Sequence, residues 1–196
     1  EADYGAALCR EANSGGGFGF NNTFIRNTAR VSGAALAWLS TEGIKIDTYY
    51  FYNNTAEVSG GSIYVDANSP NCKVINSTFD GGMVRTGRGG DIDWIGSNGY
   101  IFNSKFSNAT SSHGGSIYVA ETSSNTQIIN SSFVDCVSFG EGGAITWFGQ
   151  DGKIIDVHFT NMTAFEAGGA IYGSGNNMEI VNSTIKFAAG AVSYRE

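Results

Sequence analysis

Two aspartates form the part of the sequence with the clearest potential for chemistry. Asp91 and Asp93 lie two residues apart in the segment Gly89-Gly90-Asp91-Ile92-Asp93. On a β-strand, residues at this spacing face the same side of the sheet and lie roughly 7 Å apart. Two such carboxyl groups could serve as the acid and base of an inverting glycosidase, or bind calcium through their oxygens. The alternative is a solvated acidic pair that forms a salt bridge with Arg88.

Three tyrosines occupy the equivalent position to Asp93 in other copies of the same segment. They are Tyr64, Tyr118 and Tyr172. If the isoleucine beside each of them points inward, the tyrosines point outward, and a flat sheet face with spaced tyrosines can bind sugars by stacking. The alternative is that a loop or a neighbouring domain covers them. The predicted ligand-binding set is therefore Tyr64, Asp91, Asp93, Tyr118 and Tyr172.

Asn-x-Ser/Thr triplets identify candidate glycosylation sites at seven positions. Four of the asparagines precede a repeated Phe or Ile by three residues and are expected to form a bend between strands. The other three, Asn53, Asn108 and Asn161, follow the Phe, where we expect an exposed corner loop. These three are the better candidates for a glycan.

The remaining reactive side chains show no spacing that indicates a site. We expect the two histidines, His113 and His158, at the surface. An odd number of cysteines without a CxxC motif favours free thiols over a disulfide framework or a zinc site. The tryptophans fall on the inward side of their strands and are predicted to be core residues: Trp38, Trp94 and Trp147.

Internal repeats organise the elements that must position these residues. Segments of the type Gly-Gly-Ala-Ile-Tyr recur at residues 60–64, 89–93, 114–118, 142–146 and 168–172. A second signal keeps step with them at separations of 26 to 28 residues: Phe24, Phe51, Phe79, Phe106, Phe133, Phe159 and Ile185. Repeats of this length cannot bury a hydrophobic face alone, so stacked repeats must share one core.

Short β-branched and aromatic segments bounded by Gly, Asn and Asp indicate strands rather than helices. A period near 27 with about three strands per repeat predicts an all-β fold, a right-handed single-stranded parallel β-helix of about seven coils. At the spacing of stacked strands, such a rod is roughly 34 Å long. We expect residues 1–196 to form one domain, excised from a longer protein, with residues 1–20 as an irregular first coil.

The composition excludes several classes of partner. The chain contains 28 glycines, 15% charged residues and a net charge of −7. Nucleic acids and anionic membranes both require clustered Lys and Arg, so neither is expected to bind. The sequence contains no run of 18 apolar residues, so any membrane contact would depend on parts absent from this chain.

Gly-Gly-Ala-Ile paired with Phe-x-x-Asn, once per coil, resembles the repeats of chlamydial polymorphic membrane proteins. Phe-x-x-Asn is present at Phe24–Asn27 and Phe51–Asn54. The wider phrase, with Asn-Ser-Thr-Phe and Asn-x-Thr-Ala, is also similar to adhesin-like surface proteins of methanogenic archaea. The resemblance covers residues 20–192 and implies an extracellular, cell-surface β-helix without catalytic residues to carry over.

Three functions are compatible with these observations. The first is a surface adhesin module that binds a cell-surface glycan or protein without a cofactor. The second is a carbohydrate-active β-helix enzyme, a polysaccharide lyase or hydrolase, which would use Asp91 and Asp93 as catalytic residues. The third is a subunit that assembles end to end through unpaired terminal strands. Calcium, bound by the same two aspartates, is the only cofactor that the residue spacing suggests.

Overall fold

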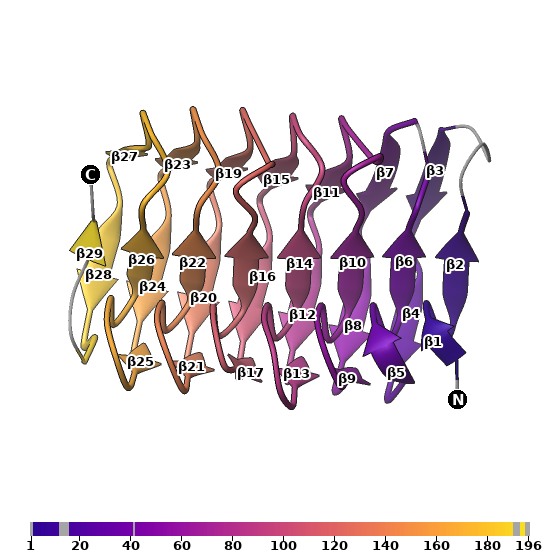
Figure 1. The fold of residues 1–196 in the computed structure, drawn as a ribbon, viewed down its shortest axis with the longest axis horizontal. Coiled ribbons are helices and arrows are strands. Elements are labelled where there is room, and N and C mark those ends of the chain that lie inside the picture. The colour runs from indigo at the N-terminus through magenta and orange to yellow at the C-terminus, as the bar shows by residue number, and fades with distance from the viewer. Residues whose placement is uncertain (1, 12–15, 41, 190–192, 195–196) are drawn as a thin grey trace.

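The computed structural model describes residues 2–11, 16–40, 42–189 and 193–194, and in them the secondary structure consists of strands (Figure 1). The strands form four parallel sheets, A to D. Each coil contributes one strand to each sheet, in the order A, B, C, D. The predicted parallel β-helix with a repeat near 27 residues is confirmed, but a coil contains four strands rather than three.

Sheet A contains β1 (Ala2–Tyr4), β5 (Thr28–Ser32), β9 (Thr55–Ala56), β13 (Met83–Val84), β17 (Thr110–Ser111), β21 (Val137–Ser138) and β25 (Thr163–Ala164). Sheet B contains β2 (Leu8–Arg10), β6 (Leu36–Trp38), β10 (Ile63–Val65), β14 (Ile92–Trp94), β18 (Ile117–Val119), β22 (Ile145–Trp147), β26 (Ile171–Gly173) and β29 (Ser193–Tyr194).

Sheet C contains β3 (Gly17–Phe20), β7 (Ile44–Asp47), β11 (Lys73–Ile75), β15 (Tyr100–Phe102), β19 (Gln127–Ile129), β23 (Lys153–Ile155) and β27 (Glu179–Val181). Sheet D contains β4 (Thr23–Ile25), β8 (Tyr50–Tyr52), β12 (Thr78–Asp80), β16 (Lys105–Ser107), β20 (Ser132–Val134), β24 (His158–Thr160) and β28 (Thr184–Lys186).

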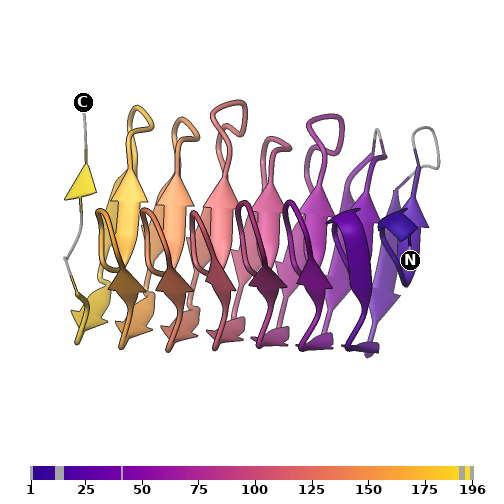
Figure 2. The ribbon, with the colours of Figure 1, turned by 60° about the horizontal axis from the view of Figure 1, so that its bottom comes forward.

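The coil winds in a right-handed direction. In Figure 1 the chain rises along sheet B in front, crosses over the top to sheets C and D behind, and returns below through sheet A while advancing from right to left. Figure 2 brings sheet A forward and shows the same stacking from below. Within residues 1–20, which we expected to form an irregular first coil, the described segments 2–11 and 16–20 already place β1, β2 and β3 in sheets A, B and C, with a shifted register between β1 and β5.

Stacked aromatic rings fill the part of the core that lies against the inward face of sheet D. Successive rings of the Phe column lie nearly parallel, with centroids 4.5 to 5.5 Å apart, from Phe24 to Phe159. The five column members Phe51, Phe79, Phe106, Phe133 and Phe159 are fully or almost fully buried. The period of the sequence thus becomes a continuous apolar stack, which is the arrangement that repeats need in order to share a core.

Each coil turns at corners where one residue adopts a left-handed backbone conformation. Between sheets A and B this residue is the first glycine of the Gly-Gly pair, as at Gly89 with φ of 65°. Between the other sheets it is usually Asn or Asp, which tolerate positive φ. Between sheets C and D the carboxamides also form a ladder, as where Asn103 donates to Asn76 over 2.7 Å.

The corner between sheets B and C varies in length from coil to coil, and coils whose sheet B strand ends in Trp have a shorter corner than coils whose strand ends in Val. Where β14 and β22 end in Trp94 and Trp147, five residues lead to the next strand (95–99 and 148–152). Where β18 ends in Val119, seven residues follow (120–126), and Ser123 in that loop is buried. The indole of Trp147 leaves room only for glycine at position 152, since a Cβ there would collide with the ring.

Candidate functional site

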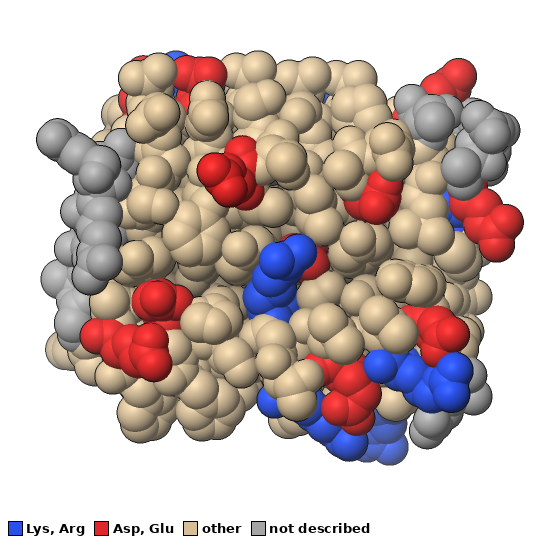
Figure 3. Space-filling model, viewed as in Figure 1, with Lys and Arg blue, Asp and Glu red and all other residues tan. Residues whose placement is uncertain are grey.

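The outward face of sheet B holds most of the residues that the sequence singled out. Tyr64, Asp93 and Tyr118 lie on adjacent strands in direct register, followed by Thr146 and Tyr172. Their side chains alternate with the inward isoleucines and tryptophans, and the predicted burial of the three tryptophans is confirmed. In Figure 3 this face is mostly uncharged, with scattered acidic residues and a few basic residues that lie next to acidic ones.

Asp93 is fully buried on this face and pairs with Arg88. The Arg88 Nε donates to both carboxylate oxygens of Asp93 at 3.2 Å. Burial raises the pKa of Asp93, whereas Arg88 and a hydrogen bond from Ser59 lower it. The salt bridge expected as the alternative to a catalytic role therefore exists, but its carboxylate is enclosed rather than solvated.

The guanidinium of Arg88 also covers Tyr118. Its central carbon lies 4.5 Å from the centroid of the Tyr118 ring, in a cation–π contact. Arg88 precedes Asp93 by five residues and comes from the corner between sheets A and B, so this corner folds over the face of sheet B. Asp93, Arg88 and Tyr118 form a chain of contacts that holds the tyrosine ring in one position.

Asp91 does not join this group, so the expectation that both carboxylates face outward is wrong. Asp91 is completely buried inside the coil, where its Oδ2 accepts a hydrogen bond from Ser116 at 2.8 Å. Its Oδ1 faces the backbone at Gly82 and lacks a hydrogen-bond partner among the described residues. The alternation of side chains holds within a strand, but Asp91 precedes β14, at the bend that begins with Gly89.

A fourth aromatic residue completes the row of rings on sheet B. Phe148 follows Trp147 at the end of β22 and points outward above the small Thr146. Its ring centroid lies 5.6 Å from that of Tyr118, at an interplanar angle of 60°, and 6.0 Å from that of Tyr172, at 76°. Phe148 therefore bridges the two tyrosines across the strand that has no aromatic residue in register with them.

Beside Phe148 the surface forms a groove of about 390 Å³. Its lining comes from β18 and from three successive corners between sheets B and C: Tyr118, Glu121, Phe148, Gln150, Ser174, Gly175 and Asn176. The seven-residue corner 120–126 stands next to two five-residue corners, 148–152 and 174–178, and this difference in length creates the recess. Figure 2 shows the uneven heights of these corners along the top of the molecule.

The predicted ligand-binding residues thus do not share one environment. Tyr118 lines the groove, and Tyr172, which is 8% exposed, supports Phe148. Tyr64 is half-buried beside Tyr4, and burial raises its pKa to about 12. Asp93 positions Arg88, and Asp91 belongs to the core.

Sequence reasoning did not select Phe148, Gln150 and Asn176 as groove residues. A partial signal existed for Phe148, because an aromatic residue directly after an inward tryptophan faces outward if the strand alternation continues for one more residue. For the polar residues there was no comparable signal, because the groove depends on the relative lengths of neighbouring corners.

The glycosylation candidates Asn53, Asn108 and Asn161 are exposed, but they do not lie in irregular loops. Each has positive φ at the corner between sheets D and A, the same conformation as the asparagines between sheets C and D. The carboxamides of Asn108 and Asn161 donate to Asp80 and Asp135 in the preceding coil. The expected distinction between bend and loop asparagines is therefore wrong.

The histidines and cysteines form no composite site. His113 contacts Glu141, with Nδ1 and Oε2 2.5 Å apart, and His158 is exposed on sheet D. Cys72 and Cys136 are free thiols, as expected, but both are fully buried, and burial raises the pKa of each. Within the described ranges, no three His, Cys, Asp or Glu side chains are grouped as a metal ion would require.

The four stacked parallel sheets and their repeating corners define the chain as a parallel β-helix repeat protein. Residues 48–66 match the model of the Chlamydia polymorphic membrane protein (Chlamydia_PMP) repeat. This segment runs from the corner before β8, through Asn54 and β9, to the Gly60-Gly61 corner and β10, and so contains both motifs noted in the sequence. No match to a curated protein or to a solved structure was found.

Proposed function

We propose that this chain is an extracellular, adhesin-like β-helix module that is displayed at the cell surface and binds a glycan or protein on another cell. The match of residues 48–66 to a polymorphic membrane protein repeat is the observation that carries this proposal. The same corner geometry recurs in coil after coil, so the match concerns the unit from which the whole domain is built.

The physical character of the molecule supports a binding role. A β-helix buries a continuous core and leaves its corners free to vary, which suits a scaffold that presents a surface. The net charge of −7 favours neutral sugars or basic protein surfaces over nucleic acid or anionic lipid. None of the described residues belongs to a helix that is long and apolar enough to cross a membrane.

The carboxylate geometry does not support the alternative of a polysaccharide lyase or hydrolase based on Asp91 and Asp93. A glycosidase pair must flank a substrate bond, with both carboxyl groups open to it. Asp91 is enclosed in the core and Asp93 is neutralised beneath Arg88. We therefore propose no catalytic residues for this chain, and no calcium site at these two positions.

The proposal has two experimental requirements. An antibody against the 196-residue chain should label intact, unpermeabilised cells that express the full-length protein. The purified chain should bind to the surface of other cells in a saturable manner, and unlabelled chain should compete with it. Labelling only after permeabilisation, or binding that does not saturate, would contradict the proposal.

A further inference from the structure

We propose that the groove beside Phe148 binds a single uncharged sugar ring, a neutral hexose or an N-acetylhexosamine, at the end of a glycan. This inference rests on the proposed function and names the ligand class and the site. The groove volume of about 390 Å³ lies near the lower end of the range for small-molecule sites, roughly 300–1,000 Å³, as expected for a ligand of this size.

The aromatic side of the groove fits the apolar face of a sugar. A pyranose ring carries C–H groups with a slight positive charge on one face, and these pack against the negative face of an aromatic ring. Phe148 and Tyr118 offer two ring surfaces inclined to each other by 60°. Both residues are partly exposed, so their rings are accessible from the groove.

The polar side of the groove fits the hydroxyl groups on the edge of a sugar. The Glu121 carboxylate accepts hydrogen bonds, while the carboxamides of Gln150 and Asn176 can both donate and accept. All three side chains are exposed at the rim. A sugar hydroxyl also donates and accepts, so these groups can satisfy several hydroxyls around one ring.

The charge of the lining discriminates between classes of sugar. Among the described residues that line the groove, Glu121 is the only charged one, and none is Lys or Arg. A sialic acid or a uronic acid would bring a carboxylate close to Glu121 without a compensating cation, and such an unpaired approach of like charges is unfavourable. The groove therefore selects against anionic sugars.

The surroundings hold the site in its shape before a ligand arrives. Tyr118 is covered by Arg88, which the buried Asp93 fixes, and Phe148 rests against Tyr172 on its other side. The floor cannot hold a larger residue at position 175, because a Cβ there would collide with the carbonyl oxygen of Gly149. Rings that are already ordered lose less conformational entropy on binding.

The inference can be tested by measuring sugar binding to the 196-residue chain. The probes are the methyl glycosides of glucose, galactose, mannose and N-acetylglucosamine, with the methyl glycoside of sialic acid as the anionic probe, detected by saturation-transfer NMR and titration. We expect at least one uncharged glycoside to bind and the methyl sialoside to bind at least about tenfold more weakly. Equal binding of the methyl sialoside, or no binding of any uncharged glycoside, would overturn the inference.

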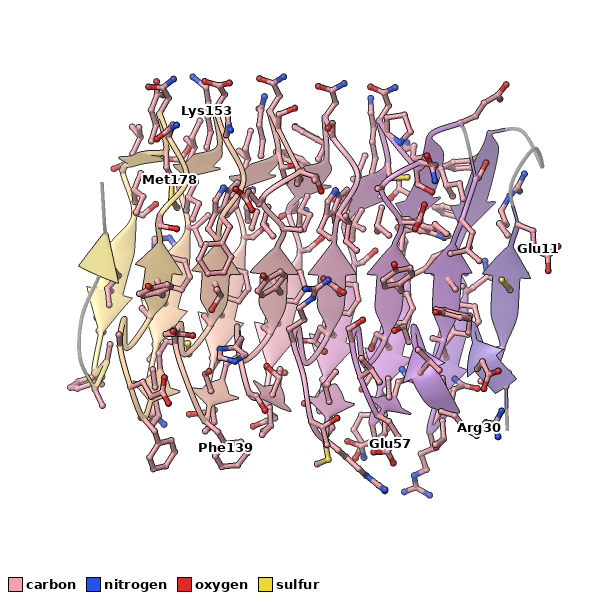
Figure 4. All side chains as sticks on the ribbon, in the orientation of Figure 1. Glu11, Arg30, Glu57, Phe139, Lys153 and Met178 are labelled. Atoms are coloured by element: carbon pink, nitrogen blue, oxygen red, sulfur yellow. The ribbon has the colours of Figure 1, made fainter. Side chains whose placement is uncertain are left out.

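Three variants localise the binding. Phe148→Ala should weaken it about tenfold or more by removing a stacking surface. Gln150→Ala changes an exposed residue that the fold does not require, so its loss of affinity cannot be attributed to unfolding. The control is Phe139→Ala, because Phe139 is 59% exposed and projects from a different corner (Figure 4). Unchanged affinity in the first two variants, or equal loss in all three, would refute this location.

The same variants separate this inference from the proposed function. If the chain binds cells and the groove variants bind them equally well, the sugar site is wrong but the adhesin module stands. If the chain binds the glycosides but no cells, the adhesin proposal fails and the sugar site stands.

Discussion

Asp91 is a carboxylic acid enclosed within the β-helix. Burial is the main cause that raises its pKa to about 8, against an ordinary value near 4. The space it occupies exists because the residue beside it is Gly82, where a Cβ would overlap Oδ1. In the preceding coil the sizes are reversed, since the large Asn54 faces the small Ser62. In both coils a large side chain at one of the two positions is therefore matched by a small residue at the other.

We predict that Asp91 makes stability fall as pH rises. Above pH 4 the unfolded chain releases a proton that the folded chain retains until about pH 8, so unfolding becomes progressively more favourable between these values. Asp91→Asn should remove this dependence and stabilise the protein at pH 8 by a few kcal/mol, on the order set by the pKa shift. Urea unfolding at pH 4.5 and pH 8 provides the measurement. Asp151→Asn, at an exposed corner, is the control, and an equal effect of both variants would contradict the prediction.

The Arg88–Asp93 pair leads to a second prediction. Arg88→Ala leaves a buried carboxylate without its cation, and since Arg88 is itself 38% exposed we expect a loss of about 1–3 kcal/mol. Adding Asp93→Thr, the residue type found at the equivalent position 146, should restore most of the stability. A double-mutant cycle from denaturant unfolding measures this coupling, and additive losses would disprove it.

Asn53 is the sequon that we predict to carry a glycan when the chain is produced in a glycosylating host. In the described part of the chain its side-chain nitrogen has no hydrogen bond to a neighbouring coil, whereas Asn108 and Asn161 donate to carboxylates. Mass spectrometry of the intact chain and of Asn53→Gln should show loss of one glycan. A glycan on Asn108 or Asn161 with none on Asn53 would contradict the prediction.

At the scale of elements, we predict that a phenylalanine in the middle of the Phe column contributes more to the free energy of unfolding than one at its end. Phe106 lies between Phe79 and Phe133 at 4.7 Å from each, so Phe106→Ala should cost about 3–5 kcal/mol. Phe24, at the partly exposed end of the stack, should lose clearly less on the same change. Urea unfolding compares the two, and equal losses would show that the stack does not act as a core.

The element scale also shows what the sequence can and cannot predict. The Phe and Gly-Gly periods predicted the parallel β-helix because each coil repeats one packing unit. A third column of corner residues was missed although it is equally regular, five positions before the known asparagines: Asn71, Asn98, Asn125, Asp151 and Asn177. The orientation of Asp91 could not be predicted, because alternation does not extend through a bend, and the groove depends on contacts between coils.

At the scale of the whole molecule, the outermost strands that the structure describes in sheets C and D each have one edge without a described partner strand. In the described chain, sheets C and D end with β27 and β28 on one side and with β3 and β4 on the other. Ile180 and Val181 in β27 are 39% and 47% exposed. Free strand edges with apolar side chains are a template for pairing with another copy.

We therefore predict that the isolated 196-residue chain associates end to end as its concentration rises. Sedimentation velocity should show species larger than the monomer, and Val181→Lys should reduce them, since a charged residue at a strand edge opposes pairing. A monomer at every concentration, or association unaffected by the substitution, would argue against this contact.

Between sheets B and C, a strand that ends in Trp is followed by a short corner and a strand that ends in Val by a longer one. This relation has a consequence for the evolution of such molecules. The strands on both sides of a long and a short corner pair in the same regular register. Exchanging a short corner for a long one therefore changes the shape of the surface while the coils stay in register. Lineages can thus acquire new recognition sites through insertions or deletions of two residues. The corner at 148–152 is the natural position for a protein engineer to graft a foreign recognition loop.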